Sequence, residues 1–588
     1  MSGLLIIVVT FVGYLIAYHT YGRFLARKIF RLDDSAKVPS VALADGIDYV
    51  PTRKGIIFGH HYTSIAGTGP IVGPAIGIIW GWVPALIWVF VGSIVMGAVH
   101  DFGALVISLR NEGKSLSEIT ARYVNARART IFFLIVFLEL LIVIAIFGVV
   151  IAAVFAKYPQ SVFPVWCEIP IAILLGLAVY RWKANVALAT VVAVTAMYVT
   201  VYLGHLEPFQ FDMAKFLAAR SFDAMPATGM WVLALLIYAY VASAVPVTVL
   251  LQPRDYINAW QLFIAMGLLL AAAVAATATT GLKVVAPALN ASPAGAPPLW
   301  PFLFITIACG AVSGFHCLVA SGTTPKQIRK ESDSLFVGYG SMLLESALAV
   351  LVIVAVGAGL GMAYEKGGQV FVGRAAWDQH YASWSAAEGL GSKVADVVAG
   401  SGNMMSALGI PKAIGIVIMG VFIASFAGTT LDTATRIQRY VVAELAGNLK
   451  IKPLANRWVA TAVAVITAGA LAYATGADGK GALRLWPMFG AVNQLLAALA
   501  LLLITLYLKR RSTWSYLLTL IPCLFMLVLT LWAMIVNETR FLRAADPNWV
   551  LVVINGLTLL LALALIVEAV IVLLRPAAGG SEPPAAAA

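Results

Sequence analysis

The sequence predicts an all-α polytopic membrane protein, and two observations support this class. Of the 588 residues, 61% are hydrophobic and only 11% are charged, whereas soluble domains are about half apolar and about a quarter charged. Apolar runs of about 20 residues recur along the whole chain, and a helix of that length crosses the hydrocarbon core of a bilayer. No stretch remains for a sizeable soluble domain, so we expect the protein to work within the membrane.

The apolar runs predict about 15 transmembrane spans. If the first span begins outside the cell, the main basic clusters face the cytoplasm, as the positive-inside rule requires. We therefore expect a multi-pass protein with its N-terminus outside and its C-terminus in the cytoplasm. Cytoplasmic loops also explain the net charge of +12 without a nucleic-acid partner. The predicted spans are residues 3–19, 56–79, 82–108, 130–156, 166–180, 185–204, 229–250, 260–282, 302–324, 337–362, 413–434, 457–475, 486–508, 514–537 and 549–574.

Two short stretches of the chain resemble each other. GHHYTSIAGTGP, residues 59–70, and GFHCLVASGTTP, residues 314–325, share glycine, histidine, Gly-Thr and proline at matching positions. Their spans cross the membrane in opposite directions, and each opens a predicted group of five. Inverted five-helix repeats that begin with an interrupted helix describe the LeuT-type transporter architecture. We therefore predict a LeuT-type 5+5 inverted repeat with extra helices.

This architecture divides the chain into five predicted parts. The two repeats are separated by two inserted spans, and further spans flank them at both ends. The parts are residues 1–55 (an N-terminal span and a cytoplasmic segment), 56–204 (the first repeat), 205–301 (two inserted spans), 302–508 (the second repeat, with an external loop at 363–412) and 509–588 (two C-terminal spans and a disordered tail).

The glycines and prolines of the two matching stretches predict unwound backbone at membrane depth, at residues 67–70 and 321–325. Broken backbone survives there only where it lines a cavity or is buried in protein. The N-termini of half-helices offer N–H groups and a positive dipole end to an anionic substrate. The alternative is that these glycines only allow close helix packing. The predicted substrate-binding residues are His61, Gly67, Thr68, Gly69, His316, Ser321, Gly322 and Thr323.

The histidines of these stretches allow more than one role. His61 and His316 occupy matching positions, and histidine titrates near neutrality, which suits proton coupling or carboxylate binding. Alternatively, each ring is neutral and bonds a backbone carbonyl that the unwinding frees. A metal site built from His60, His61 and His316 is a weaker alternative because no fourth ligand is evident. We expect no metal and no other cofactor.

Further polar residues in apolar spans are candidates for ion or proton coupling, because charges at membrane depth are costly. Glu139 is flanked by apolar residues and predicts a proton relay. Ser425, Thr429 and Thr430 offer hydroxyls for a sodium site, where Asp432 either joins them or carries a proton. The alternative is that these hydroxyls bond carbonyls of their own helix.

Several motifs resemble the carbon starvation protein A family, also called the peptide transporter carbon starvation family. They are DYVPTRKGIIFGHHYTSIAGTGPIVGPAIG (48–77), VMGAVHDFGAL (95–105), SGTTPKQI (321–328), SFAGTTLDTATRIQRY (425–440) and LWPMFGAVNQLLAALAL (485–501). The resemblance implies proton-driven uptake of peptides or pyruvate across the bacterial inner membrane, and membership of the APC superfamily with the LeuT-type fold. It implies no role for individual residues.

The resulting prediction is a secondary active symporter for small carboxylate-bearing nutrients, pyruvate or short peptides. Coupling to protons and alternating access around two unwound helices are expected. The alternative is a sodium-coupled amino-acid or peptide symporter. The chain carries no HExxH, GxSxG or P-loop motif, so neither an enzyme nor an ATP-driven pump is indicated. The sequence does not indicate an oligomeric state.

Overall fold

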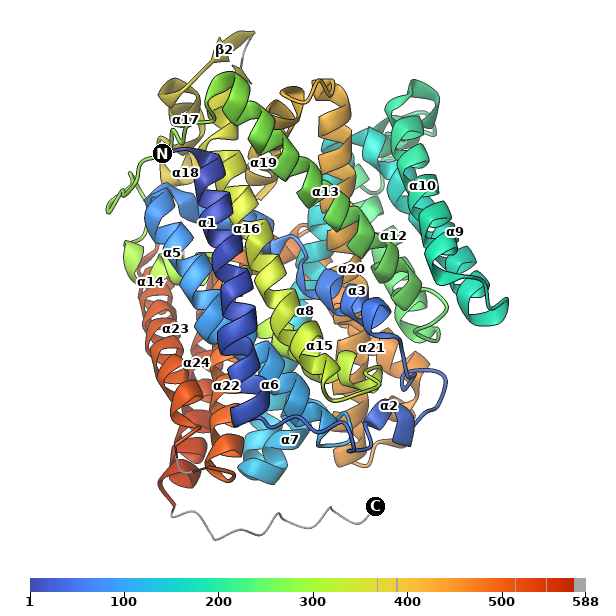
Figure 1. Ribbon diagram of the computed structural model, residues 1–588, viewed down its shortest axis with the longest axis vertical. Coiled ribbons are helices and arrows are strands. Elements are labelled where there is room, and N and C mark those ends of the chain that lie inside the picture. The colour runs from blue at the N-terminus through green and yellow to red at the C-terminus, as the bar shows by residue number, and fades with distance from the viewer. Residues whose placement is uncertain (367, 388–389, 513, 546, 576–588) are drawn as a thin grey trace.

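The computed structural model describes residues 1–366, 368–387, 390–512, 514–545 and 547–575, which form a bundle of helices (Figure 1). One end of the bundle holds α2 (Pro39–Ala42) and α7 (Leu116–Tyr123), and we call it the inner end because the charges predict that it faces the cytoplasm. The opposite, outer end holds the N-terminus and α17 (Arg374–Tyr381). The predicted disordered tail, from residue 576 onward, lies outside the described residues.

The protein is an all-α, multi-pass membrane protein. Twelve helices of the described chain are long and apolar enough to span a membrane, and one bent pair raises this to 13. Each predicted apolar segment coincides with a helix or a broken pair, although the count of about 15 crossings stays a prediction. The long helices include α1 (Gly3–Ala17), α5 (Trp82–Gly92), α6 (Ala98–Leu109), α8 (Ala126–Lys157), α9 (Val162–Gly176), α10 (Val186–His205), α12 (Ala227–Ala244), α13 (Leu251–Thr280), α16 (Ser341–Gly357), α20 (Lys412–Asn448), α21 (Arg457–Tyr473), α22 (Trp486–Lys509), α23 (Leu517–Arg543) and α24 (Trp549–Leu574).

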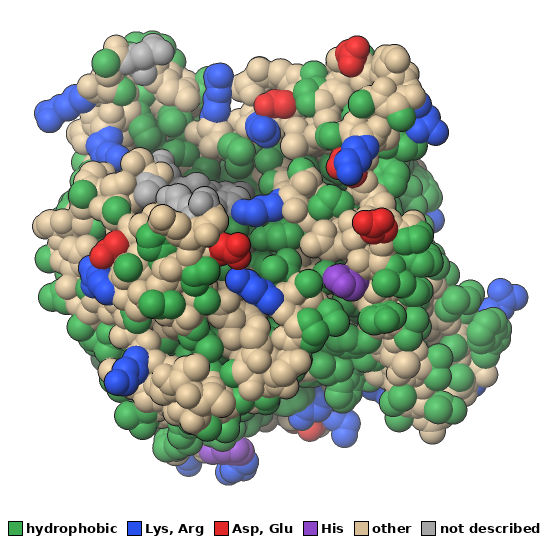
Figure 2. Space-filling model, turned by 90° about the horizontal axis from the view of Figure 1, so that it is seen from above, with side chains coloured by type: hydrophobic (Ala, Val, Ile, Leu, Met, Phe, Trp, Pro, Cys, Tyr) green, Lys and Arg blue, Asp and Glu red, His purple; other side chains and the backbone are tan. Residues whose placement is uncertain are grey.

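The outer surface of the bundle is apolar where lipid would contact it. Leu188 is 67% exposed, Ile466 68% and Leu560 66%, which would be costly for side chains in water but not in a bilayer. Figure 2 views the molecule from the outer end, where charged side chains are scattered among polar and apolar ones.

The first predicted break is confirmed. α3 (Lys54–Ile65) and α4 (Gly69–Gly77) meet at an angle of 42° across a break of three residues. Pro70 lies in the first turn of α4, where a proline is tolerated because the N–H it lacks would have no helical partner.

The second break differs from the prediction. α14 (Leu299–Thr306) and α15 (Gly314–Gly322) are interrupted at residues 307–313, where Gly310 adopts a positive φ of 88° that glycine reaches without steric cost. The predicted segment 321–325 instead ends α15 at the inner end, where a 3₁₀ turn that contains Pro325 begins at Thr324. The prediction was wrong because a Gly-Thr-Thr-Pro sequence terminates a helix as readily as it interrupts one. The two matching stretches therefore do not occupy equivalent places.

Helix packing also points to a different division of the first repeat. α8, α12, α20 and α21 contact one another in every pairing, and α13 lies along α3 and α20. In contrast, α9 and α10 form a hairpin at the edge of the bundle (Figure 1). We infer that α9 and α10 are the inserted pair, and that α12 and α13 complete the first repeat in place of the predicted spans 166–180 and 185–204.

The predicted external loop is largely folded. It contains a two-stranded hairpin, β1 (Tyr364–Lys366) and β2 (Gln369–Phe371), then α17, α18 (Trp384–Ala387) and α19 (Leu390–Ser406). α19 packs against α4, α13 and α20. Tyr381 donates a hydrogen bond to the carbonyl of Ala75 on α4, at 2.5 Å. The outer half of the first broken helix is therefore held by this loop.

Candidate functional site

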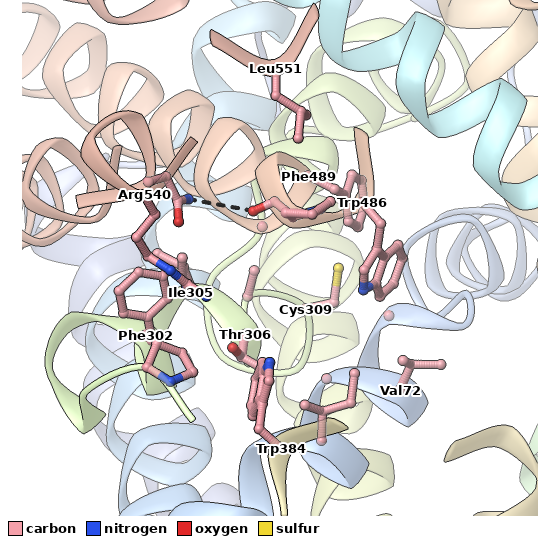
Figure 3. A pocket seen from close by; sticks show the side chains of 18 of the residues that line it. Val72, Phe302, Ile305, Thr306, Cys309, Trp384, Trp486, Phe489, Arg540 and Leu551 are labelled. Atoms are coloured by element: carbon pink, nitrogen blue, oxygen red, sulfur yellow. Dashed lines mark hydrogen bonds between the residues drawn. The ribbon is translucent and has the colours of Figure 1, made fainter. Parts of the chain in front are cut away.

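A cavity of about 380 Å³ lies on the outer side of the two breaks (Figure 3). Its floor contains Thr68 and Gly69 from the start of α4 and Cys309 from the second break. Its walls are largely aromatic, and exposed Arg540 stands in the wall near the outer end of α23. The aromatic residues are Phe147, Phe302, Trp384, Trp486, Phe489 and Phe541.

The two breaks touch at the floor of the cavity. A Cβ added at Gly69 would lie 2.4 Å from the side chain of Cys309, and one added at Gly310 would lie 3.6 Å from the Cα of Pro70. Glycine is therefore needed at residue 69 so that the backbone of α4 can approach the side chain of Cys309. In the first turn of α4, Pro70 has no N–H, and the N–H groups of Ile71 and Val72 bond the carbonyl of Thr68. The N–H of Gly69 is therefore the donor that this turn offers to an anion, together with the positive end of the helix dipole.

Two amide side chains of α22 hold the second break in shape. Asn493 accepts a hydrogen bond from the N–H of Phe315 at 2.9 Å, which satisfies a free donor in the first turn of α15. Gln494 donates to the carbonyl of Phe304 at 2.5 Å, near the end of α14. These bonds replace the helical ones that the break removes.

The glycine at residue 69 leads to a testable prediction. We expect Gly69→Ala to reduce uptake strongly, because the new methyl group would overlap Cys309, and overpacking of this kind costs about 1–3 kcal/mol. The double variant Gly69→Ala with Cys309→Gly should recover much of the uptake. Initial uptake rates and thermal melting of the two variants check this, and equal losses in both would contradict the proposed contact.

Arg540 is the one charged side chain among the described residues that line the cavity. Its guanidinium lies 5.7 Å from the centre of the Phe302 ring, and Figure 3 shows it on the cavity wall. Arginine binds carboxylates through paired hydrogen bonds. Arg540 was not among the predicted site residues, although an arginine at the outer end of a span departs from the positive-inside rule and is therefore a usable signal.

The predicted substrate-binding residues separate into two groups. Thr68 and Gly69 line the cavity, and Gly67 lies just below, where an added Cβ would be 2.3 Å from the Thr430 hydroxyl. The other predicted residues are buried nearer the inner end and do not appear among the described cavity residues. These are His61, His316, Ser321, Gly322 and Thr323.

The histidines bind separate partners below the floor. Nδ1 of His60 lies 2.5 Å from the carboxylate of Asp255, and Nδ1 of His61 lies 2.8 Å from the hydroxyl of Thr324. Within the described residues, no group of three or more His, Cys, Asp or Glu is arranged to hold a metal ion. The weaker alternative, a metal held by His60, His61 and His316, therefore has no support from the geometry.

His316 belongs to a buried cluster of acids and imidazoles. Its Nδ1 lies 3.2 Å from Asp101 and its Nε2 lies 3.2 Å from Glu345, while Asp101 also pairs with His100 at 2.8 Å. Glu345 accepts a hydrogen bond from the N–H of Gly310 at 3.1 Å. This cluster therefore connects ionisable groups directly to the backbone of the second break.

The predicted sodium site holds an arginine. Arg254 of α13 pairs with Asp432 through a short hydrogen bond, and its Nε lies 3.9 Å from Glu168. Tyr238 donates to Asp432 at 2.7 Å. The three charged side chains are at most 2% exposed. An added Cβ at Gly428 would lie 2.4 Å from the guanidinium, so Arg254 packs closely against α20.

The hydroxyls expected to bind sodium have other partners. Ser425 donates a short hydrogen bond to Glu168, and Thr429 accepts one from Asn258 at 3.1 Å. Thr430 faces the carbonyl of Ser64 at 3.5 Å, which is a long contact. Arg254 was missed because α13 begins at Leu251, whereas the predicted span begins at residue 260.

Glu139 lies on α8 and is fully buried. Neither of its carboxylate oxygens has a hydrogen-bond partner among the described residues. An isolated charge at membrane depth costs several kcal/mol, so Glu139 remains a candidate for carrying a proton. It does not line the cavity.

The inner end is closed by ion pairs. Asp48, in the loop before α3, accepts hydrogen bonds from Arg436 at 2.7 Å, Arg439 at 2.8 Å and Tyr440 at 2.8 Å, all on α20. Arg110 and Glu331 form a second pair at 2.5 Å. Ion pairs thus join the elements of the inner end while the cavity lies on the outer side, an arrangement that suits one state of an alternating-access cycle.

We call the group formed by Asp48 with Arg436, Arg439 and Tyr440 the Asp48 latch. Its hydrogen bonds should not change with pH in the physiological range. Burial alone would raise the pKa of Asp48, but Arg436, Arg439 and Lys326 outweigh it and hold that pKa at about 2. A lowered folded-state pKa contributes stability above the unfolded value, and this is lost only as pH falls towards 2. We expect Asp48→Asn to increase labelling of a cysteine introduced below the breaks. When Asp48 is kept, labelling of the same introduced cysteine should stay constant from pH 5 to 8. An increase in labelling within that range would contradict the proposed latch.

Comparison with known proteins gives matches over nearly the whole chain. The family model described as carbon starvation protein CstA matches residues 2–533. The peptide transporter CstA of Campylobacter jejuni is 34% identical over 90% of this chain and 80% of its own length. The pyruvate/proton symporter BtsT of Escherichia coli is 33% identical over 91% of this chain and 81% of its own. The peptide transporter CstA of Bacillus subtilis is 33% identical over 97% of both chains.

Solved structures give weaker matches. MhsT in complex with L-phenylalanine has a TM-score of 0.47 and 12% identity, covering 89% of this chain and 98% of its own. A manganese transporter of Eremococcus coleocola has a TM-score of 0.44 and 12% identity, covering 90% and 98%.

Proposed function

Because the chain belongs to the carbon starvation protein CstA family, and is therefore a membrane transporter rather than an enzyme, we propose that it is a proton-coupled symporter for small carboxylates. Pyruvate is the first substrate to test, and short peptides are the alternative. The observation that carries this proposal is the cavity in which Arg540 and the start of α4 face a common space.

The charges around the cavity favour a carboxylate without an ammonium group. A substrate carboxylate would meet Arg540 near the outer end, and at the floor the N–H of Gly69 with the positive dipole end of α4. A peptide also carries an α-ammonium, which needs an acidic partner. No acid is present among the described residues of the cavity wall, and Glu139 and Asp432 lie elsewhere.

The polar clusters support protons rather than sodium as the coupling ion. Where sodium would bind, Arg254 already supplies a positive charge to Asp432 and Glu168. Binding a further cation beside a fixed guanidinium would be electrostatically unfavourable. In contrast, the His316 cluster and Glu139 offer buried ionisable groups with no fixed cation from the described chain beside them other than the imidazoles themselves. BtsT, the relative named as a pyruvate/proton symporter, is consistent with this choice.

The ion is tested by replacing sodium with choline. We expect uptake of labelled pyruvate into proteoliposomes to be unchanged by the replacement, because Arg254 fills the cation position, and to be abolished by a protonophore. Uptake that requires sodium would instead assign the ion site to Ser425, Thr429 and Thr430. Liposomes without protein provide the background, since the neutral acid crosses bilayers unaided.

The substrate is tested by competition in the same vesicles. Unlabelled pyruvate and other short monocarboxylates should compete strongly with labelled pyruvate, whereas dipeptides should compete at least tenfold less well, because their ammonium group has no partner on the cavity wall. Equal competition by dipeptides would make peptides the leading substrates.

A further inference from the structure

A second groove, of about 770 Å³, lies on the flank of the bundle between α10 and α13. Arg53, which precedes α3, and Lys183, in the turn before α10, line one part of it. Val191, Trp260 and Ile264 line the rest. The groove thus combines a cationic end with an apolar channel, and neither the cavity nor the buried clusters described above use its residues.

The cationic end suits an anionic group. Arg53 and Lys183 are both exposed, and neither takes part in an ion pair within the described chain. No acid appears among the described residues that line the groove. The N-terminus of α10 lies beside them and adds a partial positive charge. An anion here would therefore be attracted and would displace no existing partner.

The apolar channel suits a hydrocarbon chain. Val191 is 63% exposed, Trp260 41% and Ile264 40%, on a flank whose helices are apolar enough to span a membrane. Tryptophan concentrates at the membrane interface, where its ring is apolar and its N–H is polar. A soluble anion would have no use for this channel, whereas an acyl chain would fill it.

We propose that this groove binds an anionic phospholipid of the inner leaflet. Its phosphate lies between Arg53 and Lys183, and one acyl chain runs along Val191, Trp260 and Ile264. Basic pockets between transmembrane helices on the cytoplasmic side recognise anionic headgroups in this way.

The groove also contacts the first broken helix. Arg53 is the N-cap residue of α3, and Tyr256 of the groove packs on Gly59 of α3, where an added Cβ would lie 3.2 Å from the Tyr256 Cα. The preceding residue, Asp255, bonds His60. A bound lipid would thus brace α13 against α3, so we expect it to raise both stability and uptake.

The test measures the melting temperature of the purified protein with added lipid. We expect phosphatidylglycerol to raise Tm by several degrees, and phosphatidylcholine or inorganic phosphate to have little effect. The double variant R53Q/K183Q should lose this shift. K450Q/K452Q, which removes the same charge from exposed inner-end positions, should retain it.

Other outcomes would overturn the proposal. Equal shifts with the two lipids would exclude headgroup recognition, and an equal shift with phosphate alone would assign the site to a soluble anion. Loss of the shift in K450Q/K452Q would point to general surface charge. If R53Q/K183Q does not fold, W260A keeps both cations and should still weaken the phosphatidylglycerol shift, and an unchanged shift in W260A would contradict the acyl channel.

Discussion

Replacing Arg254 with glutamine is expected to abolish transport and to lower stability by about 3–5 kcal/mol, because it leaves the carboxylates of Asp432 and Glu168 buried without their cation. Both acids are at most 2% exposed and lie within 4 Å of the guanidinium. Thermal melting of the purified variant and uptake in proteoliposomes measure the two effects.

The paired variant Arg254→Gln with Asp432→Asn is the control for this prediction. Removing Arg254 together with Asp432, its nearer partner, should recover part of the lost stability, because only Glu168 is then left buried without a cation. Transport should stay impaired, because the fixed cation that packs against α20 is still missing. If Arg254→Gln melts like the unchanged protein, the ion pair is not the element that holds α13 to α20.

The second large effect concerns Arg540. We expect Arg540→Gln to raise the KM for pyruvate about tenfold or more, because a hydrogen bond to a charged group contributes about 1.5–3 kcal/mol. The maximal rate should change little, since Arg540 lies in the wall of the cavity and away from the breaks. The KM of Arg540→Lys should lie between the KM of the unchanged protein and that of Arg540→Gln, because lysine keeps the charge but not the paired hydrogen bonds.

Arg543→Gln is the matched control for Arg540. Arg543 lies on the same helix, is exposed, and is absent from the described cavity wall. It should leave the KM unchanged. Similar increases in the two variants, removed by added salt, would mean that Arg540 acts only through the general surface potential.

The sequence predicted the fold class well because helix length and apolarity are encoded locally. The interrupted first span was also predictable, since Gly67, Gly69 and Pro70 are unsuited to a continuous helix. The second break was not, because Gly310 and Cys309 carry a weaker signal than the Gly-Thr-Thr-Pro sequence at 322–325, which ends α15. Local sequence does not distinguish a helix that stops from one that resumes.

The polar sites were predicted as residues rather than as arrangements. Asp432, Glu139 and the two histidines stood out because charge in an apolar span is unusual. Their partners did not stand out, because Arg254 and Asp255 fall between two predicted spans. Only the packing of α13 against α20 and α3 brings Arg254 to Asp432 and Asp255 to His60. The cavity could not be predicted for the same reason, because the helices that line it are distant from one another in the sequence.

Proton symport through the cavity is tested most directly by measuring whether protons enter the vesicles together with pyruvate. Proteoliposomes loaded with a pH-sensitive dye, in sodium-free buffer, would receive pyruvate outside. Proton symport should give a saturable acidification of the lumen that exceeds the acidification in protein-free vesicles. At low pyruvate concentration this acidification should be reduced in Arg540→Gln but not in Arg543→Gln. Uptake of labelled pyruvate without acidification, or acidification only after sodium is added, would contradict proton symport.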